Sequence, residues 1–154
     1  MTLYFAYGSN MSRALMGMRC AGAQPLGRAM LAGWRFMINR DGHGTIAPRS
    51  GDCVHGVLWR LSMRDLAALN AYEGVDTGLY ARRLMPVRHG SRRVTALVYI
   101  ARAGGKGRPR PSYVDVVVEA GRDWQLPEAY IRSLARRSLT RWRGARARDT
   151  GELG

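Results

Sequence analysis

The stretch TLYFAYGSN, residues 2–10, decides how the chain begins to fold. Residues 2–7 are apolar, aromatic or β-branched, a pattern that predicts a buried strand. The strand then stops at a Gly-Ser-Asn turn signal, and Ser12 is placed to cap a short helix through Met16. Successive backbone N–H groups in such a turn make a concavity that suits a carboxylate or a developing oxyanion. Local sequence leaves two interpretations open: an ordinary β-turn and an anion-binding turn.

A chain of 154 residues, 46% of them hydrophobic, predicts one folded domain. It holds no run of 18 apolar residues, and its N-terminus lacks the charged-then-apolar layout of a secretory signal. We therefore expect a soluble, cytoplasmic protein. Cys20 and Cys53 show no CxxC spacing and no clustered histidines, which disfavours a disulfide scaffold or a structural zinc site. Both thiols are expected to be reduced and buried.

The chain is strongly basic, with 25 Lys and Arg against 11 Asp and Glu and a formal charge of +14. A field of that sign attracts nucleic acid, acidic metabolites and anionic membrane surfaces without choosing among them. Seven arginines lie between Arg132 and Arg148, with no acidic residue in that span. We interpret the span as a solvated helix face followed by a loose tail, which predicts a domain over residues 1–139 and a basic tail over residues 140–154.

Two further helices carry clear boundary signals. Ser62 and Asp65 have capping-box spacing, and the helix that they open is expected to end at Glu73, before a glycine. Pro127 suits a first helical position and opens a last helix to about Leu139.

The strands follow from alternating or continuous apolar runs. Beyond the first, they are expected over residues 28–39, 45–47, 53–61, 79–88 and 93–101, with a turn over 48–52 and a hairpin loop over 89–91. The valines of residues 112–121 also favour a strand by local propensity. Together these elements predict an α+β fold: a small, mostly antiparallel sheet that curls into a barrel, with flanking helices.

Glu73 differs from the other glutamates of the chain. Glu119 falls among exposed positions, Glu128 suits the first turn of a helix, and Glu152 lies in the tail. Glu73 ends a well-patterned helix, where a negative charge opposes the helix dipole, and a flexible Gly-Val-Asp-Thr-Gly loop follows it. Such a position suits a general acid or base, although a solvated helix terminus stays open as an interpretation.

Other catalytic signals are weak. The residues His43, His55 and His89 have no partner at a triad or metal spacing, so we interpret them as structural. Ser9 lacks the G-x-S-x-G motif of serine hydrolases. The glycines of residues 104–107 lack the P-loop framework, and no dinucleotide-binding fingerprint is present.

Four segments, taken together, resemble the γ-glutamylcyclotransferase family. They are FAYGSN at residues 5–10 followed by Met, GVLW at 56–59, EGVDTGLY at 73–80, and PSY at 111–113 ahead of Leu-Pro at 126–127. Each segment alone is weakly specific, but all occur in the family's order, from residue 3 to about 138. The Tyr-Gly-Ser-Asn form resembles the branch that acts on γ-glutamyl amino acids or amides rather than the glutathione-specific branch.

The resemblance implies a cofactor-independent reaction in which the substrate's α-amine attacks its own γ-carbonyl, giving 5-oxoproline and a free amine. Glu73 would be the general acid/base, with a pKa above the usual value of about 4.3 if it faces an apolar pocket. The resemblance implies a helix, not a strand, over residues 112–121. The implied substrate-binding residues are Tyr7, Gly8, Ser9, Asn10, Met11, Tyr80 and Tyr113.

The expected partner is a small γ-glutamyl substrate, with no metal, no organic cofactor and no membrane; nucleic acid is disfavoured and a homodimer stays open. Two alternatives differ in class. One is a basic nucleic-acid-binding module that uses the arginine-rich C-terminus, where Trp142 alone offers an aromatic ring for stacking. The other is a non-catalytic protein that binds 5-oxoproline on the same fold.

Overall fold

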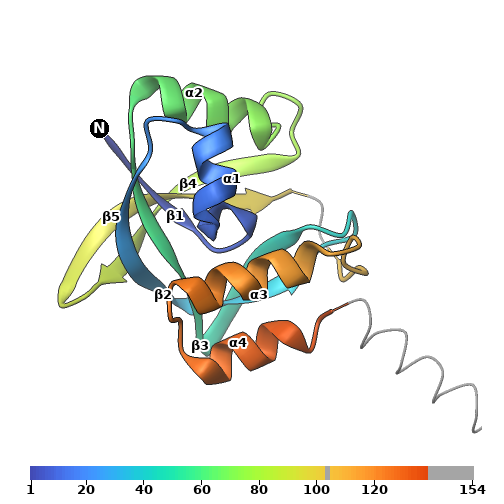
Figure 1. The fold of residues 1–154 in the computed structure, drawn as a ribbon. Helices are drawn as coiled ribbons and strands as arrows, with labels where there is room; N and C mark the ends of the chain where they lie inside the picture. The colour runs from blue at the N-terminus through green and yellow to red at the C-terminus, as the bar shows by residue number, and fades with distance from the viewer. Residues whose placement is uncertain (103–104, 139–154) are drawn as a thin grey trace, which may run out of the picture.

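The computed structural model describes residues 1–102 and 105–138, in which five strands close into a barrel in the order β1-β3-β2-β4-β5 (Figure 1). The strands are β1 (Thr2–Ala6), β2 (Gln24–Ile38), β3 (Gly44–Leu61), β4 (Tyr80–His89) and β5 (Arg92–Ala101). Neighbouring strands pair antiparallel except β1 and β5, which are parallel and close the barrel at Tyr4 and Leu97. The expected α+β class and the mostly antiparallel barrel are confirmed.

The β2–β3 hairpin is the largest element, and it corrects the prediction of a turn over residues 48–52. β3 is one continuous strand, and its pairing with β2 shifts in register so that residues 49–52 lie opposite Gly33 alone. Residues 49–52 are exposed, and Gly33 has a positive φ of 85°. The polar residues therefore mark a bulge in a solvent-facing part of the strand. Residue types that form turns also occur in such bulges.

The β4–β5 hairpin is tighter than expected. His89 pairs with Arg92, so it belongs to β4 rather than to the loop, and Gly90 and Ser91 alone make the turn. Gly90 has a φ of 63°, the left-handed conformation that two-residue hairpin turns require.

Four α-helices pack around the barrel in the described part of the chain: α1 (Arg13–Arg19), α2 (Met63–Tyr72), α3 (Tyr113–Asp123) and α4 (Glu128–Ala135). The Ser62–Asp65 capping box is present in full at the start of α2. Ser12 caps α1 as predicted, by accepting a hydrogen bond from the Leu15 N–H, and the helix continues beyond Met16 to Arg19.

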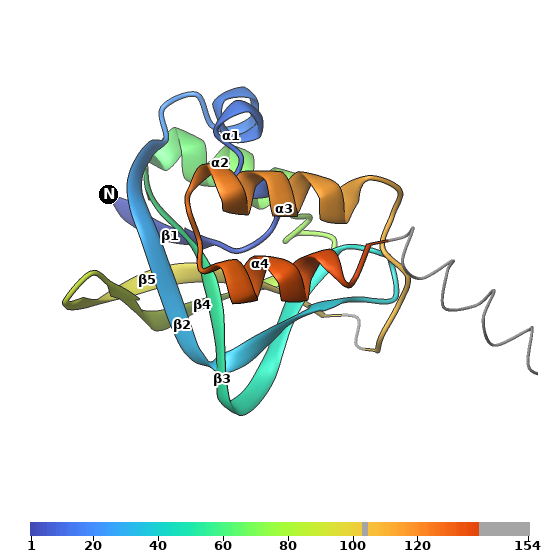
Figure 2. The same cartoon turned by 60° about the horizontal axis from the view of Figure 1, so that its bottom comes forward.

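The segment that local propensity assigns to a strand is helix α3, as the family resemblance implies. Val114, Val117 and Ala120 fall on one face of α3 and are buried in the core. Figure 2 shows α3 and α4 side by side over the barrel. Burial of this apolar stripe outweighs the strand preference of β-branched residues, because tertiary packing exceeds the small propensity differences.

The remaining expectations have mixed outcomes. The last helix begins after Pro127, its N-cap, and ends at Ala135 rather than near Leu139. Cys20 is buried and Cys53 half-buried, and neither forms a disulfide. The predicted tail over residues 140–154 lies outside the described residues. Within the described ranges, no helix combines the length and apolar character needed to cross a membrane.

Candidate active site

A cavity of about 210 Å³ opens where the end of β1 meets α1, α2, β4, β5 and α3. Of the residues named from sequence, the lining includes Tyr7, Gly8, Ser9, Asn10, Glu73, Tyr80 and Tyr113. Met11 is not part of this lining, because its side chain is completely buried and its carbonyl accepts a hydrogen bond from Trp124 Nε1 at 2.7 Å. The fold thus gathers segments from along the chain into one pocket.

Glu73 is the C-cap residue of α2, and its N–H donates to Leu69 O at 2.9 Å. The backbone at this position is therefore fixed by the helix, while the half-buried side chain reaches the cavity. Burial raises the pKa of Glu73 to about 7, against a smaller lowering by the Arg19 charge. The direction agrees with the sequence-based expectation, and a carboxyl with this pKa exchanges protons readily at neutral pH.

Asn10 connects the turn to Glu73. Its Nδ2 donates to Glu73 Oε1 at 3.3 Å and to Tyr4 Oη at 3.0 Å, while its Oδ1 accepts from Arg19 Nη1 at 2.5 Å. A guanidinium only donates hydrogen bonds, so the atom of the Asn10 amide that faces Arg19 must be the oxygen. The amide nitrogen is thereby directed toward Glu73. Asn10 is only 4% exposed, which makes these partners necessary.

Arg19 also braces the turn itself. Its Nη1 donates to Ser9 Oγ at 3.0 Å, and its guanidinium lies 4.0 Å from the centroid of the Tyr72 ring. The side chain therefore links α1, the turn and the end of α2 at one edge of the cavity.

The hydroxyl of Tyr113 lies against two glycines. A Cβ added at Gly8 would come within 2.7 Å of this oxygen, and one added at Gly44 within 2.6 Å. Burial raises the pKa of Tyr113 to about 12, while hydrogen bonds from the backbone N–H groups of Gly44 and Ser9 act in the opposite direction. Gly8 and Ser9 both line the cavity, so the turn lies where an anion-binding turn would act.

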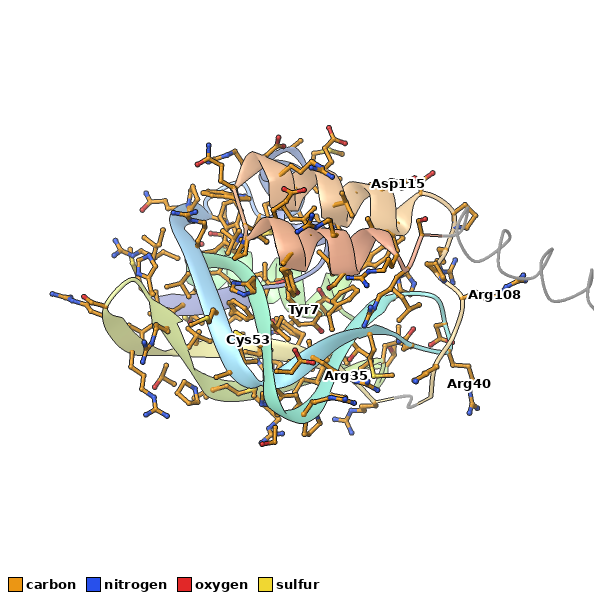
Figure 3. All side chains as sticks on the ribbon, turned by 90° about the horizontal axis from the view of Figure 1, so that it is seen from below. Tyr7, Arg35, Arg40, Cys53, Arg108 and Asp115 are labelled. Atoms are coloured by element: carbon orange, nitrogen blue, oxygen red, sulfur yellow. The ribbon has the colours of Figure 1, made fainter. Side chains whose placement is uncertain are left out.

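Tyrosine is the commonest residue type of the wall, since six of the chain's seven tyrosines line the cavity. Tyr80 Oη donates to Gly44 O at 2.9 Å, and Tyr7 Oη donates to Tyr99 O at 2.5 Å. Figure 3 shows Tyr7 inside the barrel. Burial raises the pKa of each of these two phenols above its ordinary value, so both stay neutral donors at neutral pH.

Several lining residues were not identified from sequence: Tyr4, Arg19, His43, Tyr72 and Tyr99. His43 was interpreted as structural, yet it lines the cavity and meets the Tyr113 ring edge-on at a centroid distance of 5.9 Å. Burial and the Arg110 charge lower the pKa of His43, which favours a neutral ring. Tyr72 directly precedes Glu73 in the chain, but only the fold brings Tyr4, Arg19, His43 and Tyr99 near Glu73, so no local pattern could have found those four.

The described residues include no group of three or more His, Cys, Asp or Glu side chains placed to hold a metal ion. His55 and His89 lie away from this cavity; His55 packs against the Tyr130 ring, and a ring nitrogen of His89 lies 2.9 Å from Leu26 O.

Comparison with known proteins gives the family. The model of the AIG2-like family matches residues 53–134, more than half of the chain. The chain belongs to the AIG2-like family. Curated relatives named gamma-glutamylcyclotransferase include a mouse protein, 29% identical over 144 residues, and a human protein, 29% identical over 143 residues. Each of these alignments covers 86% of this chain and 76% of the relative.

Solved structures agree with this membership. A structure named gamma-glutamyl cyclotransferase is 26% identical with a TM-score of 0.82, covering 87% of this chain and 86% of that one. Bacillus subtilis YkqA is 24% identical with a TM-score of 0.76, covers 88% of this chain and 53% of that one, and supports the fold alone. The resemblance drawn from the sequence motifs is thereby confirmed for this AIG2-like protein.

Proposed function

We propose that the protein is a γ-glutamylcyclotransferase that converts a γ-glutamyl amino acid or γ-glutamyl amine to 5-oxoproline and a free amine. The observation that carries the proposal is the meeting of Glu73 Oε1 and Asn10 Nδ2 at 3.3 Å inside one cavity. It joins a carboxyl whose pKa is raised to about 7 with the turn suited to an anionic oxygen. The names of the curated relatives support the same reaction.

The reaction begins with proton removal. The α-ammonium group of the substrate is not nucleophilic, and Glu73 as a carboxylate accepts one of its protons. The amine nitrogen then attacks the γ-carbonyl carbon, which closes a five-membered lactam and places a negative charge on the carbonyl oxygen. As the oxyanion collapses, protonated Glu73 gives its proton to the leaving nitrogen, and the bond from that nitrogen to the carbonyl carbon breaks. The regenerated Glu73 carboxylate then removes the second proton from the ring nitrogen, which gives the neutral lactam, and this proton passes to the released amine, which is an ammonium ion at neutral pH. General acid/base catalysis of this kind contributes about 10²- to 10⁴-fold.

The turn supplies binding and charge stabilisation. The backbone N–H groups of residues 8–10, which line the cavity, donate to the glutamyl carboxylate or to the oxyanion when substrate is bound. Loss of one donor of this kind costs about 3 kcal/mol in the transition state. Tyr7, Tyr80 and Tyr113 enclose the glutamyl chain and hold the folded conformer in which amine and carbonyl meet.

The test is release of 5-oxoproline from a panel of γ-glutamyl amino acids and γ-glutamyl amines, with wild type and Glu73→Gln assayed together. Release by the wild type that disappears in the variant supports the proposal, and the preferred panel member defines the leaving amine. If no member is turned over, titration with 5-oxoproline separates a binding protein from an inactive site. Saturable binding without turnover would favour the alternative, a non-catalytic protein that binds 5-oxoproline, over the enzyme.

A further inference from the structure

A second cavity, of about 430 Å³, lies where β2, the loop before α3 and the end of α4 meet. We call it the basic pocket because five of its lining residues are Arg35, Lys106, Arg108, Arg136 and Arg137. None of the described residues that line it is acidic, and it shares no lining residue with the Glu73 cavity. Figure 3 shows Arg35 on β2 and Arg108 on the loop toward α3.

Arg137 is the anchored cation of the basic pocket. Its Nη2 donates to Phe36 O at 2.9 Å and its Nη1 to Ser133 O at 3.4 Å, so both acceptors are neutral carbonyls. The side chain is half-buried. Burial, followed by the charges of Arg35 and Arg136, lowers the pKa of Arg137; Tyr130 acts in the opposite direction more strongly than either arginine, and Asp52 acts in that direction less strongly. The guanidinium is thus held in place without a carboxylate beside it.

Among the described residues, no carboxylate forms an ion pair with a cation of the basic pocket. The ion pair found in the described ranges joins Arg122 to Glu128, away from this cavity. Like charges held together repel and oppose folding, and a bound anion removes that repulsion. Guanidinium groups match phosphate oxygens in a two-pronged geometry and are less strongly hydrated than ammonium groups.

The other walls of the basic pocket are apolar, made by Met37, Ile38 and Pro109. A charged rim over an apolar floor suits a ligand with a phosphate end and a less polar body. The volume lies within the range of small-molecule sites, which runs from about 300 to 1,000 Å³.

We propose that the basic pocket binds a phosphorylated ligand. Arg35, Lys106 and Arg108 donate hydrogen bonds to the phosphate oxygens, and the apolar wall contacts the group to which the phosphate is attached. The same chemistry is offered by a free nucleotide and by the phosphate backbone of a nucleic acid. The site is independent of the cyclotransferase reaction, and it differs from a general attraction of anions because specific side chains surround a defined volume.

The experiment is calorimetric titration of the full chain with ATP, a short single-stranded RNA, inorganic phosphate and polyglutamate. The test variant is Arg35→Gln with Arg108→Gln, which leaves the hydrogen bonds of Arg137 untouched. The matched control is Arg60→Gln with Arg64→Gln, two exposed arginines that line none of the cavities described above. Both variants lose the same charge, and thermal unfolding checks that each stays folded.

We expect saturable binding of ATP or RNA at one site per chain, about tenfold weaker in the test variant and changed by less than about twofold in the control. Binding of ATP would show that a free nucleotide is a sufficient ligand for the basic pocket. Binding of RNA without binding of ATP would show that the ligand is the phosphate backbone of a nucleic acid. Equal weakening in both variants, equal binding of polyglutamate, or no saturable binding of any phosphate probe would each overturn the site.

Discussion

Asn10 Nδ2 lies 3.3 Å from Glu73 Oε1, although 63 positions separate the two residues along the chain. The amide is held in this orientation by Arg19, whose Nη1 donates to Asn10 Oδ1 at 2.5 Å. Three residues from the first turn, from α1 and from the end of α2 thus form one hydrogen-bonded chain.

Glu73→Gln keeps the shape of the side chain but removes its ability to accept a proton. We expect the fold to persist and kcat for 5-oxoproline release to fall by about 10²- to 10⁴-fold. Glu119→Gln, at an exposed position of α3, is the control and should retain wild-type turnover. Near-normal turnover in a folded Gln variant contradicts the assignment of Glu73.

The pH profile should carry the raised pKa of Glu73. Because the carboxylate is the active form, kcat/KM is expected to rise with pH through about 7 and then level until another group titrates. A free-enzyme profile already flat from pH 5 upward would show that Glu73 is not the base.

The same shift affects stability. Folded Glu73 holds its proton more tightly than the unfolded chain does, so this group favours the fold at pH values below its unfolded-state pKa and loses that contribution as pH rises to about 7. Between pH 5 and 8, the Tm of the wild type should therefore decline relative to that of Glu73→Gln. The measurement is the Tm difference between the two proteins at each pH. A difference that does not change between pH 5 and 8 contradicts the raised pKa of Glu73.

Arg19→Gln should shift the acid limb of the kcat/KM profile to higher pH, because it removes a charge that lowers the pKa of Glu73. It should also lower turnover, because the Asn10 amide is no longer held in its orientation. Arg19→Lys keeps the positive charge but lacks the planar guanidinium that can bind Ser9 and Asn10 together. It should therefore return the pH of the acid limb toward the wild-type value more fully than it returns turnover. Arg64→Gln removes an equal charge from the exposed face of α2 and should leave the limb in place. An unmoved limb in Arg19→Gln would exclude a role for Arg19 in setting Glu73.

Gly8→Ala should destabilise the fold by about 1–3 kcal/mol, because the new methyl group would lie 2.7 Å from the Tyr113 hydroxyl. Tyr113→Phe removes that oxygen, and the next ring atom, Tyr113 Cζ, is 3.9 Å away, so Gly8→Ala should cost much less in that background. Gly17→Ala in α1 has open space around it and should stabilise by up to about 1 kcal/mol. The coupling is measured by urea unfolding of the wild type, Gly8→Ala, Tyr113→Phe and the double variant. If the free-energy changes of the two single substitutions add up in the double variant, the proposed clash between the Gly8 methyl group and the Tyr113 hydroxyl is rejected.

Local signals identified much of the architecture and part of the site. The capping box, the first strand and its turn, and the helix that ends at Glu73 were all visible, since each depends on neighbours within a few residues. Errors arose where distant packing decides: residues 49–52 belong to a bulged strand. Local propensity alone would also have made residues 112–121 a strand; the family resemblance gave the helix, in which Val114 and Val117 face the core.

The sequence by itself determined the fold class, the motif set that resembles the γ-glutamylcyclotransferase family and the choice of Glu73 among the glutamates. Only the tertiary structure decided that Arg19 orients Asn10, that His43 joins the cavity wall, and that burial brings the pKa of Glu73 to about 7. The physical reason is range. Propensity and capping act between residues close along the chain, whereas desolvation and side-chain hydrogen bonding depend on which segments barrel closure brings together.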